Sequence, residues 1–160
     1  MMGPRGVIAA SAAVFCLVFG GSALKGLTTT GRAVDGVSPS AAVQKPTTND
    51  GVYTTKQADA AKAQFDKICA DCHPFTVAGK KKVKDVPLGE DPFYENWTGR
   101  PLTELITTIA LTMPNDGSAV VTDEEAADLV AYILQQNGFK PGAAPLTKAT
   151  AGAVVERPKK

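Results

Sequence analysis

The chain has 160 residues, enough for one domain with accessory segments. Its formal net charge is +1, so the charge balance gives no reason to expect a nucleic-acid partner. It contains three cysteines and a single histidine, and this scarcity limits which metal or cofactor sites the chain can build.

Residues 1–24 are predicted to be an export segment. Arg5 supplies the positive charge that precedes it, and no charged residue occurs from Val7 to Leu24. The segment is either a signal peptide or an N-terminal membrane anchor, because the uncharged run approaches the ~20 residues that cross a bilayer. Arg5 then sets the amino end in the cytoplasm. The rest of the chain is expected in the periplasm or at the extracytoplasmic face of the membrane.

Residues 25–51 are predicted to form a flexible linker, because they are rich in Thr, Ser, Gly and Pro and show no sustained apolar period. In an anchored protein this linker would be a tether. A folded domain is expected at residues 52–142, and residues 143–160 are expected to be a disordered tail.

The first predicted helix begins at a capping box formed by Thr54 and Gln57 and continues through the stretch 58–73. Its apolar stripe, with the spacing i, i+3, i+4 and i+7, consists of Phe65, Ile68, Cys69 and Cys72. We therefore expect both cysteine sulfurs on the buried side of this helix.

Two further helices follow. One begins near Pro101 and must end before Pro114, because a proline disfavours helical geometry in the residue that precedes it. The other begins at a capping box of Thr122 and Glu125 and ends at Asn137. No convincing strand pattern is present. The sequence thus predicts an all-α domain of three to four short helices, with a core so small that a staple, metal or cofactor should complete it.

Residues 69–73 read CADCH, a motif with three possible chemistries. A redox dithiol belongs at the start of a helix, whereas this pair closes one. Structural zinc needs four ligands, and Cys69, Cys72 and His73 supply three with no other cysteine or histidine in the exported domain. Covalent haem c uses every residue, because the two sulfurs form thioethers with the haem vinyl groups and the histidine coordinates iron. The motif therefore favours one covalently bound haem.

Met113 is the candidate for the opposite iron position. Met1 and Met2 precede the export segment, so Met113 is the domain's only methionine, and His73 is the only histidine. Ordinary core packing is the alternative for Met113, but Pro114 and the absence of rival ligands favour coordination. A histidine–methionine pair leaves no open iron position, so the chain is expected to be an electron carrier and not an enzyme. A haem sensor or a peroxidatic enzyme would require that Met113 be displaced.

With both ligands placed, residues 52–142 resemble a class I c-type cytochrome. The resemblance rests on CADCH, on TMP, and on the segment that begins FYENWTGRPLTEL, which is similar to single-haem domains associated with quinoprotein dehydrogenases. It implies a small cytochrome c fold, in which a proline carbonyl accepts a hydrogen bond from the haem histidine, here Pro87. It also implies a tryptophan near the haem edge, here Trp97, for which plain core packing is the alternative. Pro74 departs from the glycine that usually follows the histidine.

The implied partners are a redox donor and a redox acceptor, such as a quinoprotein dehydrogenase or a terminal oxidase. The alternative is an electron-transfer subunit of a larger membrane dehydrogenase or oxidase complex. Four lysines occur close together shortly after the motif: Lys80, Lys81, Lys82 and Lys84. This lysine cluster is either a solvated loop or a surface that attracts an acidic partner.

Overall fold

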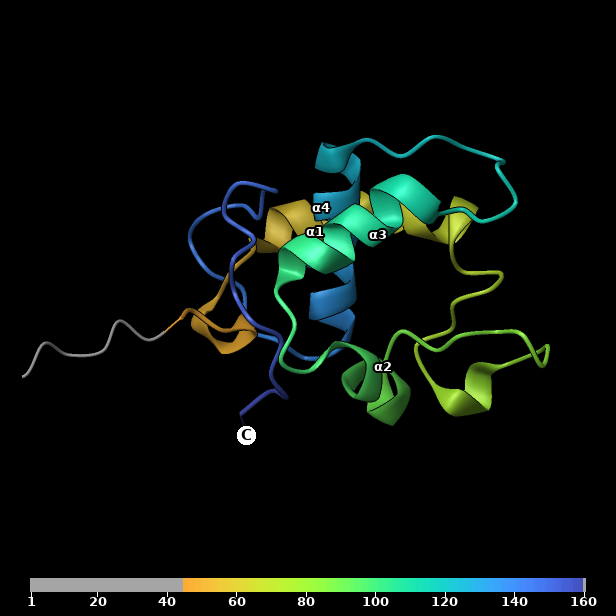
Figure 1. Ribbon diagram of the computed structural model, residues 1–160, viewed down its shortest axis with the longest axis horizontal. Coiled ribbons are helices and arrows are strands. Elements are labelled where there is room, and N and C mark those ends of the chain that lie inside the picture. Colours follow the sequence, from red (N-terminus) through yellow and green to blue (C-terminus); the bar gives the residue numbers. More distant parts are fainter. Residues whose placement is uncertain (1–44, 160) are drawn as a thin grey trace, which may run out of the picture. The chain divides into compact units, whose positions relative to one another are not determined.

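The structure, a computed structural model, describes residues 45–159. It contains four α-helices, α1 (Thr55–Ile68), α2 (Glu90–Trp97), α3 (Leu102–Thr112) and α4 (Asp123–Gln136), and two short 3₁₀ helices, η1 (Thr48–Asp50) and η2 (Val77–Gly79) (Figure 1). Within this range there are isolated β-bridges but no strand. The predicted all-α fold class is confirmed.

The predicted export segment lies outside the described residues, as does the linker up to residue 44. None of the helices in residues 45–159 is both long enough and apolar enough to cross a membrane.

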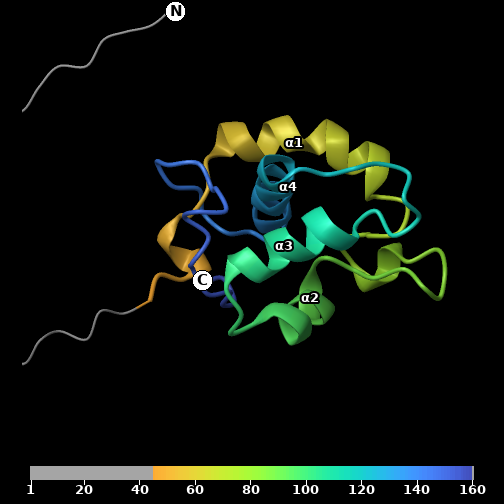
Figure 2. The same cartoon turned by 45° about the horizontal axis from the view of Figure 1, so that its top comes forward.

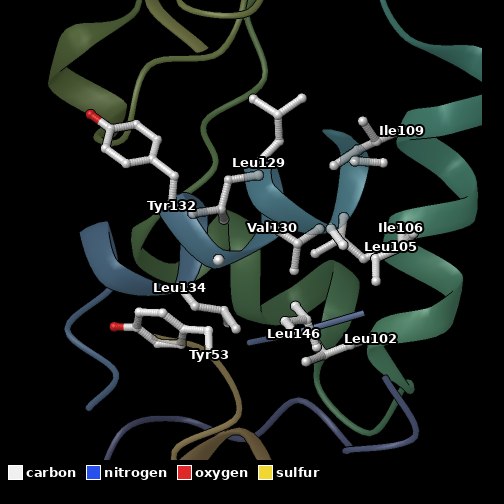
Figure 3. Packing of buried hydrophobic residues seen from close by; sticks show 14 of the residues in the cluster. Tyr53, Leu102, Leu105, Ile106, Ile109, Leu129, Val130, Tyr132, Leu134 and Leu146 are labelled. Carbon is white, nitrogen blue, oxygen red and sulfur yellow. The ribbon is translucent and has the colours of Figure 1, made fainter. Parts of the chain in front are cut away.

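Helix α4 is the centre of the core. It packs against both α1 and α3, which cross it on different sides (Figure 2). The apolar stripe predicted for α3 is fully buried and points toward α4 (Figure 3). Its members are Leu102, Leu105, Ile106 and Ile109. The stripe predicted for α4 is also buried, and α4 packs more extensively against α1 than against α3.

The helix ends follow the predicted capping signals, with one exception. At α4 the box is complete: the Glu125 amide donates to Thr122 Oγ1, and the Thr122 amide donates to Glu125 Oε2. At α1 the Gln57 amide donates to Thr54 Oγ1, but the Gln57 side chain does not reach back. Its Nε2 instead donates to Asp128 Oδ1 and to the carbonyl of Leu146, both at 2.7 Å. Gln57 therefore joins α1 to α4 and to the C-terminal segment.

Residues 143–159 pack on the domain, so the prediction of a disordered tail is wrong for this segment. Four of its apolar side chains are at most 1% exposed: Leu146, Ala151, Ala153 and Val155. The backbone of Val154 forms bridges with Thr47 and Pro101. The segment thus covers the start of α3 and packs against the first of the described residues, near Thr47. We call it the C-terminal strap.

The ordered region also begins before Val52, so the predicted domain bounds of 52–142 are too narrow. Thr48 is fully buried, and its hydroxyl exchanges hydrogen bonds with the backbone of Glu156. Where the strap begins, the backbones of Gly51 and Gly142 cross. A Cβ atom on Gly142 would lie 1.8 Å from the Gly51 carbonyl oxygen, and Gly51 has φ of +69°, so this crossing requires glycine at both positions.

The two ends of the described region lie together. In Figures 1 and 2 residues 45–50 and the strap occupy one end of the domain, and the carboxyl ends of α1 and α3 occupy the other. The CADCH motif and Met113 follow these two helix ends directly.

Candidate functional site

The CADCH motif forms a tight turn at the end of α1. Helix α1 ends at Ile68, and the amides of Cys69 and Ala70 both donate to the Phe65 carbonyl. The amides of Cys72 and His73 then both donate to the Cys69 carbonyl, at 3.1 and 3.0 Å. Since the helix does not continue, the predicted burial of both sulfurs is wrong for Cys72. Cys69 is half-buried and Cys72 is exposed.

The environment of Cys69 does not suit a redox dithiol. Burial raises the pKa of the Cys69 thiol to about 11, which keeps it protonated at neutral pH. A reactive dithiol needs a lowered pKa, such as the start of a helix provides. Here the pair follows the end of a helix. The predicted exclusion of thiol–disulfide chemistry therefore has a structural reason.

His73 is oriented by a backbone carbonyl. Its Nδ1 lies 2.9 Å from the carbonyl oxygen of Val86. A carbonyl can only accept, so Nδ1 carries the proton and the lone pair of Nε2 is free to bind a metal. The imidazole is therefore held in the tautomer that an iron ligand needs.

The predicted partner of His73, Pro87, is incorrect by one residue. The segment 86–88 runs alongside the motif: the Val86 amide donates to the Cys72 carbonyl at 3.0 Å, and the Leu88 amide donates to the Pro74 carbonyl at 2.8 Å. Alternate residues of an extended segment point their backbone groups in opposite directions. Val86 therefore faces the motif and Pro87, which has no amide proton to donate, faces away.

Sequence reasoning missed Val86 because a backbone carbonyl has no residue signature. Pro87 gave the signal that could have found it. In an extended segment the amide and the carbonyl of one residue point to the same side. Because proline has no amide proton to donate, a segment that pairs with the motif should turn Pro87 away from it and the preceding residue toward it.

Met113 is the first residue after α3. Its amide donates to the Ile109 carbonyl at 3.1 Å, and its side chain is half-buried against the core. It lies at the same end of the domain as Cys69–His73 (Figures 1 and 2). In the loop after Met113, hydrogen bonding by Ser118 lowers the pKa of Asp116.

Trp97 is the last residue of α2. Its ring is half-buried against the core, and the Arg100 guanidinium carbon lies 4.4 Å from the ring centroid. These contacts explain how Trp97 is held, while its place beside a cofactor stays a prediction.

The segments that contain or follow the candidate ligands expose apolar side chains. Within residues 45–159, the large apolar side chains that are exposed all come from two segments, 77–86 and 111–120. They are Val77, Val83, Val86, Leu111 and Val120. The first segment follows CADCH and the second contains Met113. A haem c would use groups of the motif itself: the free Nε2 of His73 could coordinate its iron, and the two free thiols could form its thioether bonds.

Comparison with known families gives a match over residues 56–133 to the family described as cytochrome C oxidase, cbb3-type, subunit III. The matched range includes CADCH and Met113 and extends from α1 into α4. No curated protein and no solved structure matched the chain.

Proposed function

Residues 56–133 form a c-type cytochrome domain, and from this premise we propose that the chain is a monohaem electron carrier. Cys69 and Cys72 would hold the haem covalently, and His73 and Met113 would coordinate its iron. The haem, when bound, supplies a one-electron redox centre. The observation that carries the proposal is the hydrogen bond of His73 to Val86, because it prepares Nε2 as a ligand directly beside the two thiols.

The chain's own residues then set the properties of the site. A hydrogen bond from Nδ1 to a carbonyl increases the basicity of the imidazole and fixes the plane of its ring. A thioether ligand from Met113 favours reduced iron and raises the potential. If His73 and Met113 both coordinate the iron, no position on it would remain open to substrate, and the domain would carry electrons without activating oxygen or peroxide.

We place the domain outside the cytoplasm, in the periplasm or at the outer face of the membrane. Support comes from the predicted export segment 1–24 and from the covalent attachment that CADCH implies. Lys45 leaves the domain at the end away from CADCH and Met113 (Figure 1). A tether attached there would leave the proposed haem end free to meet redox partners.

A second candidate function is that of an electron-transfer subunit in a larger membrane complex. The matched family is described as a subunit of an oxidase, which favours this alternative. The redox chemistry would be the same, and the difference lies in the partner. Co-purification with other subunits from detergent-solubilised membranes would favour the complex. Recovery of a free protein would favour the independent carrier, with a dehydrogenase and an oxidase as its donor and acceptor.

Intact mass tests the proposed attachment. The full chain should be exported together with a haem-attachment system. Its mature mass should then exceed that of the polypeptide by one haem, and a variant with Cys69→Ala and Cys72→Ala should lose this increment. The matched control is Thr112→Ala, an exposed residue near Met113, which should retain the haem. An unmodified wild-type polypeptide, recovered under conditions in which a known c-type cytochrome is loaded, would overturn the proposal.

A further inference from the structure

In residues 80–87, the loop that carries the partner of His73, only two side chains are buried. They are Asp85, which is 3% exposed, and Pro87, one on each side of Val86. Residues 80–84 and Val86 are exposed, and Val83 is 99% exposed. Apolar packing therefore restrains this loop only after Val86, at Pro87, and Asp85 is the one buried group before Val86.

The Asp85 carboxylate closes the loop into a turn. Its Oδ2 accepts hydrogen bonds from the amides of Lys81 and Lys82, both at 2.8 Å. The Asp85 amide also donates to the Lys82 carbonyl at 3.1 Å. Hydrogen bonds to a charged acceptor are stronger than neutral ones, so this carboxylate is the main restraint on the backbone of residues 81–85.

The turn leads directly into the contacts with CADCH. Val86 follows Asp85, and it contacts the motif twice, through its amide to the Cys72 carbonyl and through its carbonyl to His73 Nδ1. Because the carboxylate holds the backbone at Asp85, it also holds the carbonyl of the next residue, Val86, which accepts the hydrogen bond from the imidazole.

The second carboxylate oxygen shows that this arrangement has a cost. Oδ1 of Asp85 is buried and has no hydrogen-bond partner, the one such side-chain atom found in residues 45–159. Leaving a buried acceptor unpaired is unfavourable, and such groups in native structures call for an explanation beyond packing. Here the unpaired oxygen belongs to the carboxylate that positions the Val86 carbonyl.

We propose that Asp85 is a positioning residue: its carboxylate holds the turn that keeps the Val86 carbonyl on Nδ1 of His73, and so it sets the orientation and basicity of the proposed iron ligand. This inference rests on the proposed function. It adds a residue that acts through Val86 without touching the haem.

The test measures solvent exchange of the His73 Nδ1 proton by NMR in the reduced, haem-loaded full chain. Asp85→Ala should accelerate this exchange by at least about tenfold, because two charge-assisted hydrogen bonds of the turn are lost. Asp85→Asn keeps an acceptor without the charge, so its exchange rate should lie between those of wild type and Asp85→Ala. The amides of Lys81 and Lys82 should follow the same order, and the reduction potential should rise as the imidazole becomes less basic.

Asp50→Ala is the matched control, since the Asp50 carboxylate also closes a turn by accepting from a backbone amide, that of Thr47. It lies at the end of the domain away from CADCH (Figure 1), so it should leave the ring proton and the potential unchanged. If Asp85→Ala does not accumulate, Asp85→Asn must still accelerate exchange of the ring proton together with the two amides. The inference is overturned if the two amides exchange faster while the ring proton does not, or if neither changes. Failure of the proposed function is separate, because it appears as a wild-type protein without covalent haem.

Discussion

The C-terminal strap should contribute strongly to stability, and Leu146→Ala is the sharpest perturbation of it. Leu146 is 1% exposed and packs near Leu102 of α3 (Figure 3). Removing three buried carbon atoms costs about 2.4 kcal/mol at roughly 0.8 kcal/mol per group. The cavity left behind raises the expected loss to about 3 kcal/mol.

That loss can be read as a change of melting temperature. The described range holds 115 residues, for which the unfolding entropy is roughly 0.24 kcal/mol/K. The melting temperature should therefore fall by about 12 °C. Equilibrium denaturant unfolding of the full-length protein, followed by circular dichroism, measures the loss of unfolding free energy itself. The loss appears as a shift of the denaturant midpoint at constant slope.

Lys148→Ala is the control within the strap. Lys148 makes an exposed ion pair with Asp123, which is worth at most about 1 kcal/mol. If Leu146→Ala lowers the unfolding free energy by less than ~0.5 kcal/mol, the range of an ordinary surface substitution, the strap is not part of the cooperative fold and our description of it is wrong.

Three further predictions concern the proposed haem end. Met113→Ala should bind added imidazole at least about tenfold more tightly than wild type, because no internal ligand has to be displaced; equal affinities in an absorbance titration would contradict the ligation. Replacing the lysine cluster by glutamines should slow reduction by an acidic redox partner about tenfold at low salt, with the difference vanishing at high salt. Stopped-flow rates with an unchanged salt dependence would exclude a docking role. Backbone hydrogen bonds, chiefly that of Lys82, hold the pKa of Asp85 below its usual value. Its stabilising effect should be complete above pH ~4 and lost as the pH falls further. Wild type should accordingly lose its advantage over Asp85→Asn in acid unfolding, and an advantage that persists at low pH would show that the charge is not its source.

The parts of the fold that follow a local rule were predictable from the sequence. Helices α3 and α4 have four or five apolar residues in one stripe, and each is bounded by a proline or a capping box. Helix α2 was not predicted as a separate element, because it buries only the adjacent residues Phe93 and Tyr94 and so shows no stripe.

The strap was missed for a different reason. Only four of its residues are buried, two of them alanines, which carry little hydrophobic signal, and their contacts are with residues about 50 to 110 positions earlier in the chain. Val154, for example, pairs with Thr47 and Pro101. Such pairing is set by tertiary structure, which no local pattern reports.

The candidate site was predictable to the level of side chains but not of the backbone. Cys69, Cys72, His73 and Met113 could be named because their chemistry is rare in this chain. The turn at Cys69, the exposure of Cys72 and the Val86 carbonyl depend on backbone geometry. Asp85 appeared in the sequence only as the acidic end of a lysine-rich run.

The central claim is that the domain carries one electron on an iron whose two axial positions are filled by His73 and Met113. A redox titration of the purified wild-type protein, followed by absorbance, tests it most directly. The account predicts a single reversible one-electron transition between low-spin, six-coordinate states, with the weak red band of methionine–Fe(III) coordination in the oxidised form. A high-spin reduced iron that binds carbon monoxide at once would contradict it.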